Sequence, residues 1–261
     1  MLRPRIIPCL LVQNNGLVKT VGFKSPKYVG DPINAVKIFN EKEADELIVL
    51  DIDATAQGTA PNFQMIAHLA AECQMPLCYG GGIKSVEHAK QIIGLGVEKV
   101  AISSAAVADP HLLTRISEAI GRQSVVAVLD VRKKTGIFSS GYEITTHNGK
   151  IAHKLNLIDF VKEIEHAGAG EIVINSVNLD GNMQGYDLNL AKEIRAAVNV
   201  PLTFLGGAGS HSHIQELFST CGIVGAAAGS LFVFKGQYRA VLINYPSQAQ
   251  KDAIAQLLPP A

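Results

Sequence analysis

Short apolar runs alternate along the whole chain with longer segments of helical periodicity, and this alternation constrains the fold most. Eight runs are candidate strands: Ile6–Val12, Leu47–Asp51, Pro76–Tyr79, Lys99–Ser103, Val125–Asp130, Glu171–Asn175, Pro201–Leu205 and Ile223–Ala227. Such apolar strands, each followed by a helix, are typical of a parallel sheet with both faces covered. No linker rich in Pro, Gly or Ser interrupts the series. We therefore predict an α/β fold, a single (β/α)8 TIM barrel spanning residues 1–261, rather than two open sheets.

Several predicted helices have recognisable starts. Acidic caps followed by proline occur at Asp31-Pro32 and Asp109-Pro110, and Ser212 with Gln215 has the spacing of a capping box. One apolar helix face follows the second of these starts, comprising Leu112, Leu113, Ile116 and Ile120.

The two halves of the chain resemble each other. Glu46, Pro76 and the pair Gly81-Gly82 match Glu171, Pro201 and Gly206-Gly207, each 125 residues further on. A constant offset through successive strands predicts two half-barrels related by an approximate twofold axis. Groups that bind a ligand are then expected in symmetric pairs.

Charge and composition exclude several classes of protein. The 23 Lys and Arg residues balance 23 Asp and Glu residues, so the chain has no basic surface for nucleic acid or an anionic membrane. The apolar N-terminal run is too short to span a membrane and lacks a signal-peptide cleavage site, which predicts a cytoplasmic protein. Cys9, Cys73, Cys78 and Cys221 have no paired spacing and are interpreted as reduced core residues. Small molecules or another protein are the expected partners.

Two clusters of glycine and serine follow predicted strands at symmetric positions. The first comprises Gly80–Gly82 with Ser103 and Ser104; the second comprises Gly206, Gly207 and Gly209 with Gly229 and Ser230. Adjacent glycines let backbone N–H groups approach an anion, and a helix N-terminus behind them adds further donors. Glycines also simply permit a turn from strand to helix, but two symmetric clusters favour phosphate binding. The implied ligand carries a phosphate at each end.

Four aspartates are candidates for acid–base chemistry at the same end of the barrel: Asp51, Asp53, Asp130 and Asp180. Asp130 ends a strongly apolar strand, whose neighbours would desolvate its carboxylate and raise its pKa. Capping of the strand end is the alternative role. The symmetry mate of Asp130 is Leu11, which cannot transfer a proton.

A ring of opposite charges is predicted at the other end of the barrel. Arg5, Glu46, Lys99 and Glu171 each stand at the start of a strand. They either close the barrel floor structurally or gate a passage for a small neutral molecule. His211 and His213 lack a third ligand, so no metal is predicted.

These features resemble the cyclase subunit of imidazole glycerol phosphate synthase over essentially the whole chain. The matching segments are Arg5–Leu10, Asp31-Pro32, Asp45–Leu47, Gly80–Ile83, Lys99-Val100, Ala105–Val107, Gly168–Glu171, Asp180-Gly181, Gly185–Asp187 and Gly206–Gly209. The resemblance implies a glutaminase partner docked on the N-terminal face of the barrel. Ammonia then passes a gate formed by Arg5, Glu46, Lys99 and Glu171. The implied reaction adds it to a bisphosphorylated ribotide and closes an imidazole ring.

The resemblance also implies roles at the barrel mouth, with no cofactor and no metal. Asp130 and the loop residue Lys19 are the implied catalytic groups, and Asp51, Asn178 and Asp180 face the substrate. The implied phosphate-binding residues are Gly81, Gly82, Ser103, Ser104, Gly181, Gly206, Gly207, Gly229 and Ser230.

Departures from the family pattern leave alternatives open. Leu11 replaces an aspartate, Asn178 an aspartate and Asn182 a threonine, while Ser103 and Ser104 replace an Asn-Thr pair. The chain is accordingly a cyclase with altered chemistry, an ammonia-channelling subunit that amidinates a sugar precursor in lipopolysaccharide O-antigen biosynthesis, or a non-catalytic scaffold that activates a glutaminase.

Overall fold

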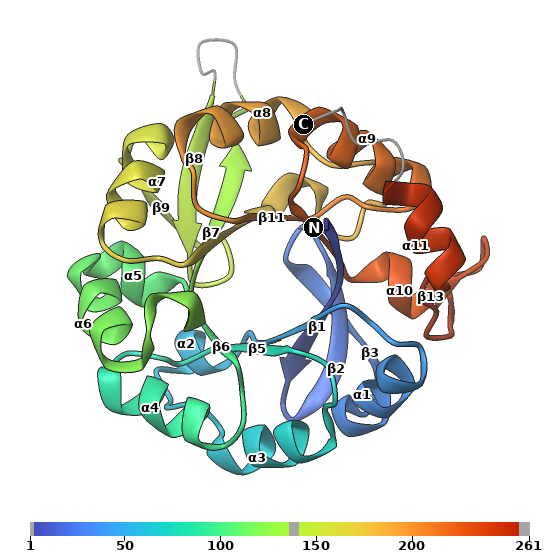
Figure 1. Cartoon of the computed structure of the whole chain (residues 1–261), viewed down its shortest axis with the longest axis horizontal. Helices are drawn as coiled ribbons and strands as arrows, with labels where there is room; N and C mark the ends of the chain where they lie inside the picture. Colours follow the sequence, from blue (N-terminus) through green and yellow to red (C-terminus); the bar gives the residue numbers. More distant parts are fainter. Residues whose placement is uncertain (1–2, 136–140, 256–261) are drawn as a thin grey trace.

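The computed structural model describes residues 3–135 and 141–255, and its centre is a parallel barrel ringed by helices (Figure 1). The barrel strands are β1 (Arg5–Gln13), β4 (Leu47–Asp51), β5 (Leu77–Gly80), β6 (Lys99–Ile102), β7 (Val125–Lys133), β10 (Glu171–Ser176), β11 (Leu202–Leu205) and β12 (Gly225–Ala228). Each pairs in parallel with the next, and β12 pairs with β1, so the sheet closes on itself. The predicted (β/α)8 barrel is confirmed, and each predicted strand overlaps an observed one.

The outer layer consists of amphipathic helices that cover the barrel. They are α1 (Pro32–Glu41), α3 (Phe63–Glu72), α4 (Val86–Gly94), α6 (His111–Ile120), α7 (Leu157–His166), α8 (Leu188–Ala197), α9 (His211–Cys221) and α11 (Gln248–Ala255). Shorter elements lie in the connections: α2 (Ala54–Gln57), α5 (Ser104–Ala108), the 3-10 turns η1 (Arg122–Ser124) and η2 (Val177–Leu179), α10 (Ser230–Val233), and the small ladder of β13 (Phe234–Lys235) and β14 (Ala240–Val241).

Of the three predicted helix starts, one is confirmed, one is displaced by a residue and one is wrong. Asp31 caps α1, its Oδ1 accepting from Asn34 N at 2.9 Å. Asp109 follows the end of α5, and α6 begins at His111, one residue later than predicted, with Asp109 Oδ1 accepting from His111 N at 3.1 Å. For α9 the cap is Ser210, which is extended and accepts from His213 N, whereas Ser212 lies inside the helix.

Apolar side chains form two layers. The larger lies between barrel and helices and includes the fully buried Phe39, Ile66 and Phe218. The smaller fills the barrel interior and comprises Ile7, Cys9, Ile48, Cys78, Ala101, Val126, Val128, Val173, Leu205 and Ala227. Alternate residues of each strand point to the two layers, as the period of a strand requires.

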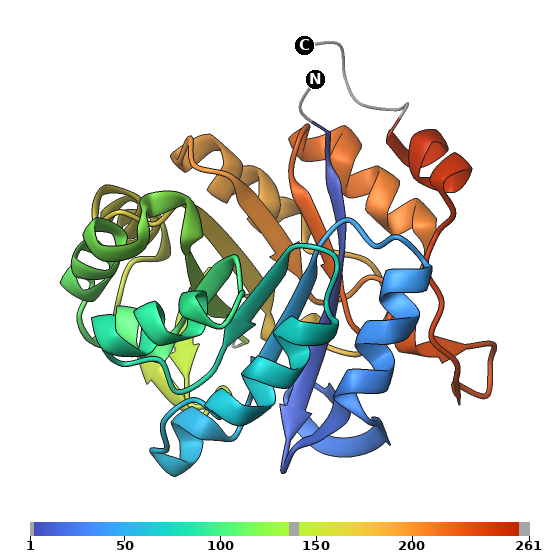
Figure 2. The same ribbon diagram turned by 60° about the horizontal axis from the view of Figure 1, so that its bottom comes forward.

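Two antiparallel hairpins interrupt the βα alternation and were not predicted. β2 (Gly16–Val21) and β3 (Lys24–Gly30) follow β1, while β8 (Tyr142–Thr146) and β9 (Ile151–His153) follow β7. The β2–β3 hairpin lies at the end of the barrel opposite the strand starts (Figure 2). Leu11 pairs with Val18 of β2 as Asp130 pairs with Thr145 of β8. This correspondence confirms that Leu11 and Asp130 occupy equivalent positions.

Candidate functional site

The two hairpins reach across the mouth of the barrel, and each is fastened to the opposite half. The Asp180 carboxylate, after β10, accepts from Thr20 Oγ1 at 2.6 Å and from Phe23 N at 3.1 Å. On the other side, Asn148 Nδ2 donates to the Ile52 carbonyl, just after β4, at 2.9 Å. The hairpin tips also approach each other at Phe23 and Gly149. The mouth is therefore covered by a fixed pair of hairpins.

Beneath the hairpins lie two cavities of unequal size. The larger has a volume of about 570 Å³ and the smaller about 40 Å³. Leu11, Phe23 and Asn175 line both cavities and so form the partition between them.

The first glycine cluster lines the larger cavity. Gly81, Gly82, Ser103 and Ser104 all face it. Gly81 has a φ of 126°, and a Cβ there would lie only 2.6 Å from the Asp51 carbonyl oxygen. Only glycine suits this position, because a side chain would meet both the strained backbone and the neighbouring strand. Because Gly81 has no side chain, its backbone is left uncovered beside the cavity.

The second glycine cluster lines the smaller cavity. Gly181, Gly206, Gly207, Gly229 and Ser230 surround it. Gly206 and Gly207 have φ values of 98° and 102°, matching the positive φ values of Gly81 and Gly82 at the symmetric position. The structure thus brings each predicted cluster together, in separate compartments.

Lys19 extends into the second cluster. It lies on β2 rather than in an open loop and is only 6% exposed. Its Nζ donates to the Cys9 carbonyl at 2.6 Å, and a Cβ on Gly229 would overlap the ammonium. Burial lowers the pKa of Lys19. The Lys19 amine therefore stands beside the backbone of Gly229, where a bound anion would favour its charged form.

Asp130 faces the larger cavity from the end of β7. Its Oδ1 accepts from Asn175 Nδ2 at 2.9 Å. Burial raises the pKa of Asp130 to about 7, with a smaller contribution from the negative charge of Asp180 and an opposing one from the Asn175 hydrogen bond. A carboxyl that titrates near neutrality both takes and returns protons readily. The structure therefore gives Asp130 the environment that its apolar strand predicts.

The other predicted polar residues, Asp51, Asp53 and Asn178, accept hydrogen bonds from nearby backbone N–H groups. Asp51 lines the larger cavity, and burial raises its pKa although its Oδ1 accepts from two backbone N–H groups, those of Asp53 and Ala54. Asp53 holds the turn after β1 by accepting from Gln13 Nε2 and Asn14 N. Asn178 lines neither cavity; its Oδ1 accepts from Lys133 N at 2.7 Å.

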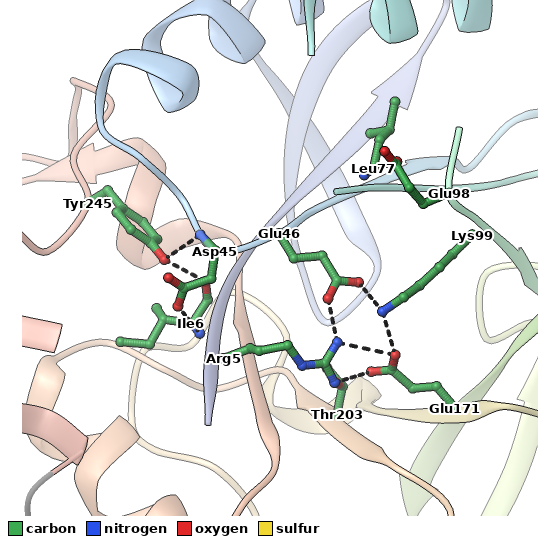
Figure 3. Close-up of polar contacts among 10 residues, drawn as sticks. All are labelled: Arg5, Ile6, Asp45, Glu46, Leu77, Glu98, Lys99, Glu171, Thr203 and Tyr245. Atoms are coloured by element: carbon green, nitrogen blue, oxygen red, sulfur yellow. Dashed lines mark hydrogen bonds and ion pairs between the residues drawn. The ribbon is translucent and has the colours of Figure 1, made fainter. Parts of the chain in front are cut away.

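The four predicted floor residues meet in a closed ring of ion pairs (Figure 3). Arg5 bonds to Glu46, and to Glu171 at 2.7 Å; Lys99 Nζ lies 2.8 Å from Glu46 and 2.9 Å from Glu171. Thr203 Oγ1 adds a 2.6 Å hydrogen bond to Glu171. Burial alone would raise the pKa of Glu171, but Arg5 and Lys99 outweigh it and lower the pKa to about 2. Sequence reasoning found the ring but missed Thr203.

Between the ring and the mouth, the barrel interior holds a cluster of apolar side chains. The thiols of Cys9 and Cys78 belong to this cluster and stay protonated because burial raises their pKa values. An ammonium ion in such surroundings would lose its hydration without gaining a partner, whereas neutral ammonia would not carry that cost.

No group of three or more His, Cys, Asp or Glu residues is placed to hold a metal among residues 3–135 and 141–255. His213 instead accepts from Gly209 N through Nδ1. Within the same ranges, no helix is long and apolar enough to cross a membrane.

Fold and site together define a class: a (β/α)8 barrel with paired glycine clusters at its mouth and an ion-pair ring across its floor. The family model described as "Histidine biosynthesis protein" matches residues 5–239, and the chain belongs to this family. It is 55% identical to the "Putative imidazole glycerol phosphate synthase subunit hisF3" of Vibrio vulnificus, over 98% of each chain. It is 37% identical to the "Imidazole glycerol phosphate synthase subunit HisF" of Clostridium botulinum, over 90% of this chain and 92% of that one.

Proposed function

We propose that this chain is the cyclase-type subunit of an imidazole glycerol phosphate synthase. It takes ammonia from a glutaminase partner, adds it to a bisphosphorylated ribotide and closes an imidazole ring. One observation carries the proposal most: the intact ring of Arg5, Glu46, Lys99 and Glu171 stands at one end of the apolar cluster inside the barrel, and the cavity with Asp130 lies at the other.

The two glycine clusters bind the two phosphates of the substrate. Gly81, Gly82, Ser103 and Ser104 hold one phosphate in the larger cavity. The second cluster, with Lys19 as counter-charge, holds the other. The cavity beside Lys19, with a volume of about 40 Å³, is much smaller than the cavity that holds the first phosphate.

Asp130 acts as the general acid–base group of the reaction. Its pKa near 7 suits proton transfer at neutral pH. Leu11, at the equivalent position of the other half, supplies no such group, and we expect the cyclase rate to be reduced for this reason. Asp51 borders the same cavity and contributes negative charge beside the substrate.

The glutaminase docks on the face of the barrel where the strands start. Glu46 and Glu171 are buried in the ring, whereas the side chains of Arg5 and Lys99 are 28% and 19% exposed on that face. The two cations are thus the members of the ring that a docked partner could displace to open a path inward.

The test compares two nitrogen sources. Purified chain is given the ribotide with ammonium salt, or with glutamine and the glutaminase, and release of the aminoimidazole carboxamide ribotide is measured. We expect Asp130→Asn to lower both rates by about 10²- to 10⁴-fold. Lys99→Met should lower the glutamine-dependent rate more than the ammonium-dependent rate. Absence of turnover by the wild-type chain with either source would refute the proposed function.

A further inference from the structure

Two histidines of the β8–β9 hairpin, one at its tip and one at the end of β9, share a single buried hydroxyl. Thr146 Oγ1 lies 2.9 Å from His153 Nε2 and 3.1 Å from His147 Nδ1. Thr146 is only 2% exposed, whereas both imidazoles are partly exposed. His147 lines the larger cavity, and His153 lies outside that lining, on the outer strand of the hairpin. The hydroxyl therefore joins a group in the cavity to a group outside it.

The backbone holds this arrangement in place. His147 and Asn148 have φ values of 55° and 57°, a left-handed conformation that is uncommon for residues other than glycine. Thr146 pairs with Ile151 to close the turn, and the Asn148 side chain ties the tip to Ile52 on the far wall. The tip is thus fixed from both sides, so His147 keeps its place beside the cavity.

The shared hydroxyl couples the protonation of the two rings. A hydroxyl has one proton, so Thr146 donates to at most one imidazole and at least one ring donates to it; in the arrangement that relays a proton, it accepts from one ring and donates to the other. When His147 carries its proton on Nδ1, Thr146 donates to His153, and His147 Nε2 presents a lone pair. Nε2 makes no hydrogen bond within the described part of the chain, which leaves it available to a ligand.

We propose that His147 is a second proton-transfer group of the larger cavity, and that Thr146 and His153 connect it to solvent. This inference rests on the proposed function. Addition of ammonia and ring closure require protons to leave nitrogen, and Asp130 holds one proton at a time. The symmetric position, Leu11, cannot take a second. His147 can, and its second ring nitrogen leads that proton away from the cavity through Thr146.

The transfer balances without any further reactant. His147 Nε2 takes a proton from the substrate nitrogen, and the Nδ1 proton of His147 moves to Thr146 Oγ1. The original hydroxyl proton of Thr146 moves to His153 Nε2, and His153 Nδ1 releases a proton to water. Both rings end neutral, each in its other tautomer, and one proton has left the cavity.

The kinetic test uses His147→Gly, because glycine adopts the observed φ without strain and leaves space for free imidazole. With ribotide and ammonium salt, we expect kcat to fall about 100-fold and to recover when imidazole is added. His166→Gln is the matched control; His166 bonds to Lys162 O on the exposed surface of α7, and we expect unchanged rates with no response to imidazole.

A second measurement does not depend on turnover. Imidazole ¹⁵N chemical shifts report which nitrogen of each ring is protonated. Thr146→Val should change the shifts of both histidines, whereas Thr146→Ser should retain them. Unchanged shifts in Thr146→Val overturn the connection, and wild-type-like kcat in His147→Gly, or loss without rescue by imidazole, overturns the role of His147. Those results leave the proposed function standing, whereas an inactive wild-type chain overturns both.

Discussion

Replacing Asp130 with asparagine should make the protein more stable at neutral pH, although it removes a proposed catalytic group. Burial raises the pKa of this carboxyl from 3.8 to about 7. A raised pKa in the folded state means that ionisation opposes folding. The opposing free energy is absent below pH 3.8, grows as the pH rises, and reaches its full value above pH 7.

The magnitude follows from the pKa values. At 1.36 kcal/mol per pKa unit, the rise from 3.8 to about 7 corresponds to about 4 kcal/mol. Because Asp130 is partly exposed to the larger cavity, solvent screens its charge, and we expect about 1–3 kcal/mol in practice. Asparagine has the same shape, and its Oδ1 still accepts from Asn175 Nδ2, so no hydrogen bond is lost.

The assay is urea denaturation followed by circular dichroism, at intervals from pH 4 to pH 8. Asp130→Asn should match the wild type at pH 4 and exceed it in free energy of unfolding at pH 8. Asp252→Asn is the control, because Asp252 is exposed, its Oδ1 still accepts from Gln248 Nε2 as an amide, and loss of its surface pair with Arg3 should change stability by less than about 0.5 kcal/mol. A stability difference that does not grow with pH, or a variant less stable than the wild type at pH 8, would show that Asp130 is not destabilised by its surroundings.

Three further variants test other parts of the structure by the same denaturation assay. Glu171→Gln should cost about 3 kcal/mol at pH 7, and the difference should shrink as the pH falls from 4.5 towards 2, since the lowered pKa of Glu171 stabilises the fold only while the carboxylate is ionised. Gly207→Ala should cost at least about 2 kcal/mol, because its Cβ would overlap the Gly185 carbonyl, whereas Gly58→Ala, in the left-handed helical conformation but in open space, should cost about 1 kcal/mol. Ser210→Ala should cost about 1 kcal/mol through loss of the α9 cap, and Ser212→Ala less than half of that; equal losses would contradict the assigned cap.

The barrel could be predicted because each of its strands carries a recognisable local sequence pattern. Runs such as Val125–Asp130 are apolar over both faces, and only a covered parallel sheet buries both faces of a strand. The floor ring was also predictable, since Arg5, Glu46, Lys99 and Glu171 each stand at a strand start and a closed barrel brings all strand starts together. In these cases the local pattern and the topology of the fold were enough.

The hairpins were missed although the sequence carries a signal for them. Asn148-Gly149, in the turn between β8 and β9, and Asn15-Gly16, where β1 turns back into β2, are both typical of tight turns between antiparallel strands, and Asn15 and Asn148 have positive φ values. The surroundings of Lys19 could not have been predicted. Its burial depends on Gly229, more than 200 residues away, and on contacts between hairpin tips that no local pattern specifies.

The hairpins also show how a symmetric scaffold comes to hold an asymmetric site. Each is tied to the opposite half at equivalent places, after β4 at Ile52 and after β10 at Asp180, so the symmetry of the fold extends over the mouth. The chemistry beneath is one-sided, because Asp130 faces an open cavity while its mate, Leu11, forms part of the partition. Each cavity keeps its own glycine cluster, but Asp130 lines only the larger one and Lys19 only the smaller one. The two cavities are therefore alike in their backbone and different in their charged side chains.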